Sequence, residues 1–221
     1  MRRQYFTVPF LLFILLFEIY YFMTNTNLNT SMEVGTVIDK FNGVNVYFNG
    51  GVNHSSGRNL SPDGYNLGIK YQCVEFVKRY YYQRFNHKMP DSMGHAKHFF
   101  DPSLKDGQLN KQRNLLQFTN GSKSKPVTED LIIFSPTLLN PYGHVAIISN
   151  VFNESIQIVQ QNAGPFSSTR AFYRLKKIDN LWYVEGRPVL GWLRVDSNTS
   201  NTIFKDTQAL NRLYHLDGNA E

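Results

Sequence analysis

The sequence predicts an α+β domain in which a short helix comes before a run of strands. Apolar side chains recur at helical spacing just after residue 72. From residue 131 onward, short apolar or alternating stretches bounded by turn residues are typical of strands. The 221 residues are 42% hydrophobic and 14% aromatic, which is typical of a globular protein and not of a disordered chain. The length fits a single domain behind a distinct N-terminal segment.

The predicted helix begins near Gln72 and carries the only cysteine of the chain in its first turn. Its apolar face contains Cys73, Phe76, Val77, Tyr80 and Tyr81. Unpaired backbone N–H groups and the positive end of the helix dipole favour a thiolate at this position, which is what a nucleophile needs. A lone cysteine is also a common small apolar residue of protein cores, so both interpretations stand at this point.

A histidine and two amides follow at positions that complement the cysteine. His144 opens a predicted strand over residues 143–148, and a second strand is predicted over residues 155–162. Strand alternation places Gln160 and Asn162 on one face, after two isoleucines, so that this face begins apolar and ends polar. These residues form a Cys-His-amide set, in which the imidazole takes the thiol proton and the amide orients the imidazole.

Five segments in order carry a resemblance to a known family. They are Tyr71–Phe76, Leu131–Phe134, Gly143–Ile148, Gln160–Asn162 and Leu190–Trp192. Together they resemble CHAP domains, which are cysteine, histidine-dependent amidohydrolases/peptidases. The resemblance covers roughly residues 35–195 and is strongest to the amidase domain of glutathionylspermidine synthetase/amidase. It implies a papain-like (NlpC/P60-type) fold with N-terminal helices packed on an antiparallel β-sheet.

The resemblance also implies roles for the site residues. Cys73 is the expected nucleophile, and His144 is the base that later protonates the departing amine. Gln160 is expected to accept a hydrogen bond from the second imidazole nitrogen. The resembling amidases carry glutamate there, so this chain lacks a carboxylate that would stabilise the imidazolium. Asn162 is a second candidate that shares or replaces the orienting role.

Two further roles concern the substrate. The backbone N–H of Cys73 is the expected oxyanion donor, with Gln72 as a second donor. Lys78 stands where the resembling amidases have an arginine that holds a substrate carboxylate. Lysine keeps the charge but loses the bidentate fork of arginine.

The chain divides into four expected parts: an apolar segment at residues 1–23, a polar linker at 24–34, the CHAP domain at 35–195 and a polar tail at 196–221. Arginines come before the apolar segment, no small-x-small cleavage site follows it, and roughly 20 residues span a bilayer. We therefore expect a membrane anchor, or a secretion signal, that places the domain outside the cytoplasm. Glu18 opposes full insertion, and a buried N-terminal helix is the alternative.

Shorter signals predict the remaining elements. Residues 35–51 contain a strand and a glycine-flanked loop, residues 91–96 a second short helix, and residues 101–130 a polar excursion. Further strands are predicted at residues 131–134, 181–186 and 189–195. Trp182 and Trp192 are expected in the core. A weak helix is expected around residues 205–216.

Several classes of site are excluded. A single cysteine allows neither an internal disulfide nor a multi-cysteine metal site. His87, His95 and His98 lack a companion carboxylate motif, so no metal or other cofactor is expected. His54 lies in a polar loop and is expected at the surface. The net charge of +6 is mild, and no dense run of Lys and Arg indicates nucleic-acid binding.

Three functions are compatible with these features. The first is hydrolysis of a peptide–amine amide, such as the glycyl–spermidine bond. The second is cleavage of peptide or sugar–peptide amides in cell-wall peptidoglycan, which an extracellular location favours. The third is a catalytically weak or silent CHAP-like binding module, which the glutamine at position 160 favours.

Overall fold

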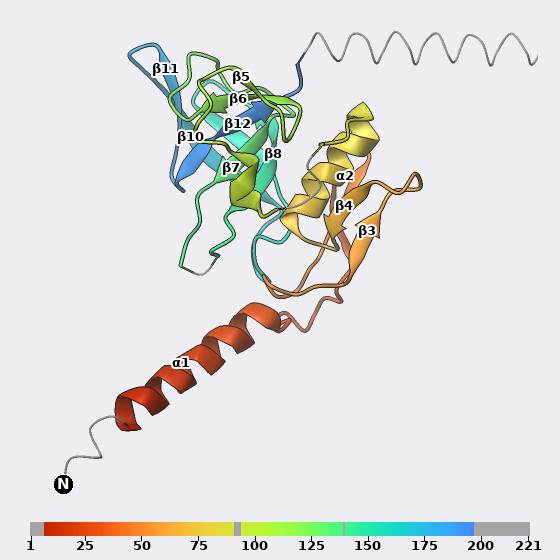
Figure 1. The fold of residues 1–221 in the computed structure, drawn as a ribbon, viewed down its shortest axis with the longest axis vertical. Coiled ribbons are helices and arrows are strands. Elements are labelled where there is room, and N and C mark those ends of the chain that lie inside the picture. Colours follow the sequence, from red (N-terminus) through yellow and green to blue (C-terminus); the bar gives the residue numbers. More distant parts are fainter. Residues whose placement is uncertain (1–6, 91–93, 139, 197–221) are drawn as a thin grey trace, which may run out of the picture.

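The computed structural model describes residues 7–90, 94–138 and 140–196 (Figure 1). The elements along the chain are α1 (Thr7–Asn25), β1 (Val37–Phe41), β2 (Val44–Tyr47), β3 (Arg58–Leu60), β4 (Asn66–Ile69), α2 (Cys73–Phe85), the 3₁₀ helix η1 (Ala96–Phe99), β5 (Gln108–Asn110), β6 (Leu115–Thr119), β7 (Leu131–Phe134), β8 (His144–Val151), β9 (Ser155–Val159), β10 (Arg170–Ile178), β11 (Leu181–Glu185) and β12 (Val189–Arg194). The predicted weak helix at residues 205–216 lies outside these ranges.

An eight-stranded antiparallel sheet forms the larger part of the domain. Its strand order is β11-β10-β9-β8-β7-β12-β6-β5. The sheet curls so that its two ends approach each other, since the N–H of Gly121 donates to the carbonyl oxygen of Trp182 (2.8 Å) and the N–H of Trp182 donates to that of Ser122 (2.7 Å). Curling lets the sheet enclose its own apolar side chains on one face. The α+β class with a large antiparallel sheet is confirmed.

The prediction of an irregular excursion over residues 101–130 is wrong, because β5 and β6 belong to the main sheet. β6 pairs with β12, and Phe118 lies opposite Trp192 in the register. The two strands are short and stand among polar residues, so their local pattern is weak. Pairing with β12 and burial of Leu115 stabilise them, and neither is visible in the local sequence.

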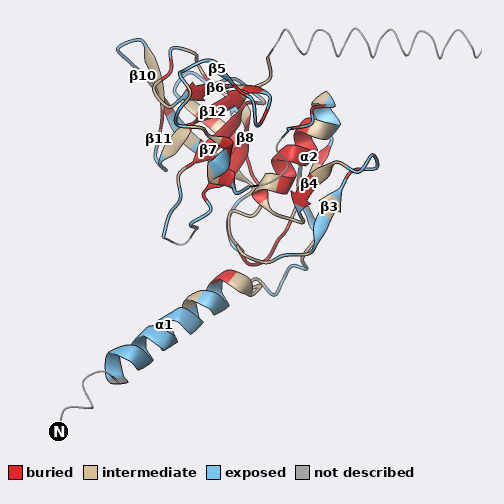
Figure 2. Cartoon of the chain, in the orientation of Figure 1, coloured by how far each residue is buried: buried red, intermediate tan, exposed pale blue. Residues whose placement is uncertain are grey.

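Two apolar cores lie on opposite faces of the sheet. One packs α2 and η1 against it through Phe76, Val77, Phe99, Val145 and Ile147. The other fills the concave face and is centred on Trp192, which is fully buried, with Trp182 packed at its margin. Figure 2 shows buried residues along α2 and the central strands. Trp192 is thus a core aromatic, as predicted, whereas Trp182 is only partly buried against that core.

α2 is the only α-helix of the domain among the residues that the structure describes, whereas several N-terminal helices were expected. Part of the predicted second helix, residues 91–93, lies outside the described residues. After it, Ala96–Phe99 forms a single 3₁₀ turn. The hairpin β1–β2 and the hairpin β3–β4 occupy the region before α2, and both have contacts with that helix.

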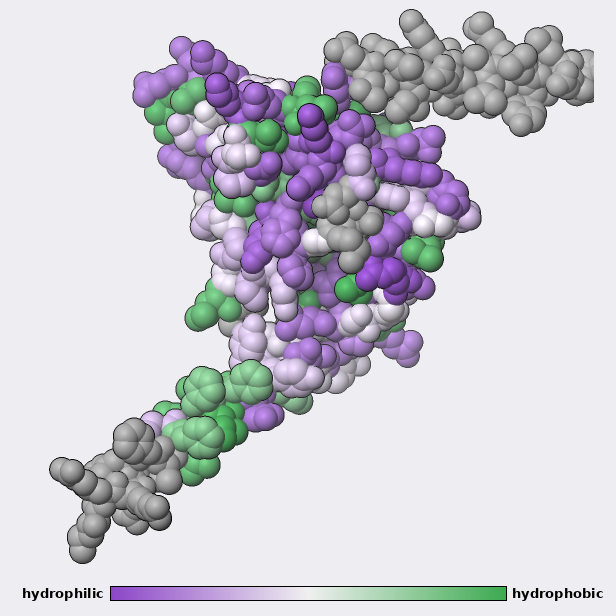
Figure 3. All heavy atoms as spheres, viewed as in Figure 1, coloured by the Kyte–Doolittle hydropathy of each residue, from purple (hydrophilic) through white to green (hydrophobic). Residues whose placement is uncertain are grey.

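The helix α1 projects from the domain and exposes its apolar side chains (Figures 1 and 3). Residues Val8–Asn25 have a mean hydropathy of 1.6, and only 6% of this segment is buried. By length and composition it can cross a membrane or serve as a signal segment, and the buried alternative is wrong. The adjoining residues 24–34 touch the domain, since Asn29 Nδ2 donates to the Pro165 carbonyl oxygen (3.1 Å).

Candidate active site

Cys73 is the first residue of α2, as the helical spacing predicts. Gln72 precedes it in an extended conformation (φ −77°, ψ 161°) and caps the helix without a side-chain hydrogen bond. Gly68 on β4 approaches the helix so closely that a Cβ there would lie 3.3 Å from Glu75 Cα, at a φ of +127° that disfavours other residues. A glycine at this position therefore lets the β3–β4 hairpin pack against the start of α2.

Burial raises the pKa of the Cys73 thiol above its usual 9.0. The backbone N–H groups of Val145, Val74 and Cys73 itself, which lie close to the sulfur, lower the pKa and oppose the effect of burial. Burial has the larger effect, so the thiol is protonated at neutral pH. The helix N-terminus was expected to favour a resting thiolate, but the residue Cys73 is only 8% exposed and desolvation has the larger effect on the pKa of its thiol.

His144 and Gln160 form a buried hydrogen-bonded pair. His144 Nε2 lies 3.0 Å from Gln160 Oε1. Gln160 Nε2 donates to the Ser168 carbonyl oxygen (2.9 Å), which turns the amide oxygen toward the imidazole. An oxygen acceptor requires a proton on Nε2. In the neutral ring Nδ1 is then an acceptor, free to receive a proton.

The cysteine and the histidine are both close to the start of β8. Val145, next to His144, belongs to the core beneath α2, and its backbone lies near the Cys73 sulfur. The His144 ring lies 6.0 Å from the ring of Phe134. Among the hydrogen bonds of the described residues, none joins the thiol to the imidazole. The structure therefore brings together His144 with Gln160, and Cys73 with the adjoining backbone.

Asn162 lies apart from His144. β9 ends at Val159, and Asn162 has a left-handed backbone with φ of +57°, so the predicted alternation fails there. Its Nδ2 donates to Gln72 Oε1 (2.6 Å) and to the Val52 carbonyl oxygen (2.9 Å). Gln72 Nε2 in turn donates to the carbonyl oxygens of Val52 (3.2 Å) and His54 (2.7 Å). Both amides thus fix the loop beside Cys73, and the Gln72 side chain is engaged by that loop.

Lys78 is buried one and a half turns along α2 from Cys73. Its ammonium donates to the Asn66 carbonyl oxygen and lies 4.7 Å from the centre of the Tyr65 ring. Lys78 is 1% exposed and is not among the residues that line the cavity at Cys73. In this structure its charge stabilises the packing of α2 on the β3–β4 hairpin.

Cys73 lines a cavity of about 460 Å³. The walls come from the loop before β3, the end of β4, the start of α2, the segment at η1 and the turn before β8. They contain Val52, Asn53, Ser55, Arg58, Gly68, Ile69, Gln72, Cys73, Val74, Gly94, His95, Ala96, Asn140, Tyr142, Gly143 and Asn162. This volume is within the range of small-ligand sites, and polar side chains surround the sulfur.

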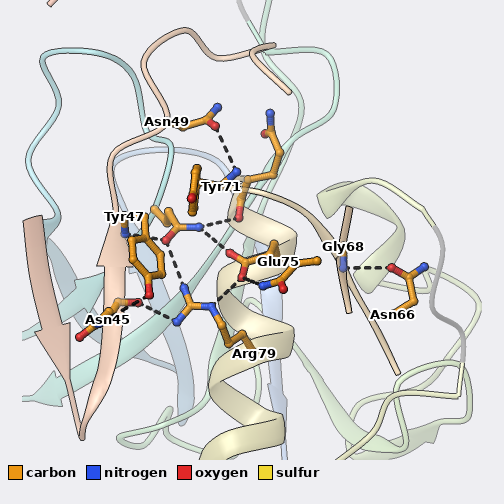
Figure 4. Close-up of polar contacts among 11 residues, drawn as sticks. Asn45, Tyr47, Asn49, Asn66, Gly68, Tyr71, Glu75 and Arg79 are labelled. Carbon is orange, nitrogen blue, oxygen red and sulfur yellow. Dashed lines mark hydrogen bonds and ion pairs between the residues drawn. The ribbon is translucent and has the colours of Figure 1, made fainter. Parts of the chain in front are cut away.

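A buried ionic network next to the site was missed by sequence reasoning (Figure 4). Arg79 Nε donates to Glu75 Oε1 (2.6 Å), and both residues lie on α2. Gln161 Nε2 donates to Glu75 Oε2 (2.9 Å) and to the Gln72 carbonyl oxygen (3.1 Å). The i,i+4 spacing of Glu75 and Arg79 was a visible signal, but it is ordinary on exposed helices.

This network joins three parts of the chain. Arg79 Nη1 donates to the Asn45 carbonyl oxygen (2.9 Å), and Gln161 Oε1 accepts from the N–H of Tyr47 (2.8 Å). Asn59 Nδ2 also donates to Glu75 Oε1 (2.7 Å). The hairpins before α2, the helix itself and the segment after β9 are thereby held together. Because Gln161 follows Gln160, the network fixes the backbone that presents Gln160 to His144.

The other histidines of the described residues have contacts away from the imidazole–amide pair. His87 is buried, and its Nε2 hydrogen-bonds to the Arg113 carbonyl oxygen (2.9 Å). His95 and His98 interact with each other around η1. His54 is half-buried and contacts Ser56 Oγ (3.1 Å), so it is less exposed than predicted. The described part of the chain contains no cluster of three or more metal-ligating side chains.

The environment of His144 leads to a pH-dependent stability. Burial, together with the positive charge of Arg187, lowers its pKa from 6.5 to about 3. Between these values the unfolded chain binds a proton that the folded chain does not bind. The free energy of unfolding is therefore expected to fall by about 1.4 kcal/mol per pH unit as the pH drops from about 6 to about 4.

Guanidinium unfolding followed by tryptophan fluorescence measures this dependence. The control is His144→Asn, which removes the ring while His87, whose pKa burial also lowers, is retained. Between about pH 6 and about pH 4, the free energy of unfolding of the variant is expected to depend on pH less steeply, by about 1.4 kcal/mol per pH unit. Equal slopes for the two proteins would contradict the buried neutral imidazole.

The chain is similar in sequence to several known proteins. The CHAP domain family model matches residues 63–162. The chain is 31% identical over 134 residues to "Trypanothione synthetase" of Crithidia fasciculata, covering 58% of this chain and 20% of that protein. It is 33% identical over 107 residues to "Bifunctional glutathionylspermidine synthetase/amidase" of Escherichia coli (strain K12), covering 48% of this chain and 17% of that protein.

The chain thus spans about a fifth of the length of the curated relatives it matches. One solved structure, "The crystal structure of Ly7917", aligns with a TM-score of 0.35 and 15% identity over 63% of this chain and 56% of that chain, which is too distant to inform the site. The family match contains Cys73, His144, Gln160 and Asn162. Residues 63–162 therefore match the CHAP domain family, and the chain is similar to the amidase domain of the glutathionylspermidine synthetase/amidases.

Proposed function

We propose that this protein is a cysteine-dependent amidohydrolase or peptidase with a papain-like active site formed by Cys73, His144 and Gln160. One observation carries the proposal. The hydrogen bond between His144 Nε2 and Gln160 leaves Nδ1 as the base, on a strand whose next residue has its backbone near the Cys73 sulfur. The hydrolase chemistry of CHAP domains and the amidase in the name of the Escherichia coli relative support the same reaction class.

The reaction begins with both groups neutral. The Cys73 sulfur bonds to the amide carbonyl carbon while the thiol proton moves to Nδ1 of His144. The carbonyl oxygen becomes an oxyanion, which the backbone N–H of Cys73 stabilises. The C–N bond then breaks, the departing nitrogen takes the proton from Nδ1, and water hydrolyses the resulting thioester. The thiol and Nδ1 must come within hydrogen-bond reach in the substrate complex, because such contacts are often loose before substrate binds.

Gln160 has a defined part in this scheme. Its oxygen holds the Nε2–H tautomer and the orientation of the ring, as an asparagine does in papain-like proteases. A neutral amide stabilises the imidazolium less than a carboxylate would, so the rate is expected to be lower than that of a glutamate-containing relative. Asn162 contributes by holding Gln72 and the loop that borders Cys73.

The exposed apolar helix α1 supports a location at a membrane, with the domain outside the cytoplasm. Its apolar side chains face solvent in the described structure, with 6% of the segment buried. Arg2 and Arg3 lie outside the described residues, and as basic residues before an apolar span they favour the cytoplasmic side. This location favours a cell-wall peptide amide as the substrate over a cytosolic glutathione–polyamine conjugate.

A silent CHAP-like binding module is the second candidate. Two observations favour it: Gln160 stands where a carboxylate is expected, and no hydrogen bond joins the thiol to the imidazole within the described chain. Such a module would bind a wall peptide or a related amide without turning it over. Retention of bound peptide without product would identify it.

A panel of amides tests these alternatives. The full chain in detergent is incubated with purified peptidoglycan, wall-peptide fragments and glutathionylspermidine, and the products are identified by mass spectrometry. Cleavage of wall peptides with release of a new amine is the expected result. Cleavage of glutathionylspermidine alone would reject the wall as substrate. If the protein binds these amides but releases no product from any of them, it is a silent binding module.

A further inference from the structure

The charge in the cavity at Cys73 is positive. Among the described residues that line it, Arg58 is the only one with a permanent charge, and none is an aspartate or glutamate. His95 is the other basic group there. Burial lowers its pKa below 6.5, so it is neutral at pH 7. Among the described residues, a substrate that enters the cavity therefore meets one guanidinium and side chains that are neutral at pH 7.

Arg58 has no acidic partner in the described structure. Its Nη1 donates to Asn66 Oδ1 (3.1 Å), and the other guanidinium N–H groups make no hydrogen bond within the described residues. Four other arginines form ion pairs with carboxylates: Arg79, Arg84, Arg170 and Arg194. An exposed arginine with open N–H groups on the wall of a catalytic cavity is suited to bind a carboxylate in a bidentate way.

The position of Arg58 relates it directly to the nucleophile. It opens β3 and pairs with Ile69 of β4 in the register of the hairpin. β4 runs into α2, where Gly68 packs against Glu75. The hairpin therefore packs on the helix that carries Cys73, which ties the backbone of Arg58 to that helix.

A second arginine, Arg187, adds positive charge near His144. The guanidinium of Arg187 lies 5.1 Å from the centre of the Phe134 ring, and Phe134 contacts His144. Its charge acts on both Cys73 and His144. The imidazole pairs with the neutral amide of Gln160, so no carboxylate hydrogen-bonded to it within the described part of the chain balances these two arginines. The field in the site favours an anion and disfavours a polycation.

We propose that Arg58 binds a free carboxylate of the substrate, so that the enzyme selects peptide amides with a carboxylate near the scissile bond and rejects conjugates with a polycationic amine. This inference rests on the proposed function and assigns its specificity. Lys78 is not available for this role, because it is buried against Asn66 and Tyr65 and does not line the cavity.

Matched substrates test the proposal. Two fluorogenic wall-peptide amides are compared, identical except that one has a free carboxylate beside the cleaved bond and the other a carboxamide. The full-length enzyme is expected to cleave the carboxylate form with a kcat/KM roughly 10- to 100-fold higher. Arg58→Ala is expected to raise KM for the carboxylate form until the two forms are cleaved equally well. The kcat/KM for the carboxamide form is expected to stay the same. Arg58→Lys is expected to restore it in part.

Arg174→Ala is the control, since Arg174 is an exposed arginine on β10 outside the cavity. This variant is expected to leave kcat/KM unchanged for both substrates. Equal losses on both substrates in Arg58→Ala, or a higher kcat/KM of the unaltered enzyme for the carboxamide form, would overturn the proposal.

A binding measurement separates this proposal from the hydrolase itself. If neither peptide is cleaved, Cys73→Ala and the double variant Cys73→Ala/Arg58→Ala are titrated with both peptides by calorimetry. Tighter binding of the carboxylate form, lost in the double variant, supports Arg58 even though the hydrolase has failed. Equal binding of the two peptides to Cys73→Ala rejects Arg58 as a carboxylate site.

Discussion

Cys73→Ala is expected to reduce amide hydrolysis by a factor on the order of 10⁴ or more while the domain stays folded. The chain contains no other cysteine, so no second thiol can take over the attack. The substitution removes one small atom at a residue that is still 8% exposed toward the cavity, so the loss of packing is small. Product release from the preferred amide, measured by mass spectrometry, gives the residual rate.

Cys73→Ser is the matched control, because serine keeps a side chain of nearly the same shape as cysteine. It keeps a group that can donate to Nδ1, but a hydroxyl is a much poorer nucleophile than a thiol, so this variant is also expected to be nearly inactive. Unfolding curves should place both variants close to the original protein. Full turnover in Cys73→Ala would show that the cysteine is only a core residue and would reject the proposed hydrolase.

Glu75→Ala is expected to lower the free energy of unfolding by about 3–5 kcal/mol. The carboxylate is fully buried and accepts hydrogen bonds from Arg79, Gln161 and Asn59. Its removal leaves the Arg79 guanidinium, which is 5% exposed, as a buried charge without its partner. Denaturant unfolding monitored through the core residue Trp192 measures the loss.

A double variant separates the charge from the packing. Glu75→Gln/Arg79→Met removes both charges and keeps comparable volume, so it is expected to recover much of the stability that Glu75→Ala loses. Activity should not recover equally, because Gln161 then loses its ionic partner beside Gln160. A change below about 1 kcal/mol in Glu75→Ala would contradict a network that holds the site together.

The sequence carried enough information to predict the start of α2, the strand that begins at His144 and the hydrogen bond from the imidazole to Gln160. These features depend on local periodicity and on turn residues, which act within a few positions. The apolar character of α1 is likewise local. Their spacing also carried the CHAP resemblance, because the segments keep their order whatever the loops between them contain.

Other features required the tertiary structure. Asn162 leaves the predicted strand face because the backbone turns left-handed after β9, and a period of two does not show where a strand ends. β5 and β6 are ordered by pairing with β12, which is distant in sequence.

The same distinction separates the chemical groups of the site from their charge states and burial. The sequence by itself determined which chemical groups are present: one thiol, an imidazole, an amide in place of a carboxylate and an i,i+4 ion pair. Only the tertiary structure decided that the thiol is protonated, that Lys78 is buried while Arg58 lines the cavity, and that Glu75 and Arg79 lie in the interior. The reason is that pKa and charge–charge energy depend on desolvation, which segments distant in the chain produce together.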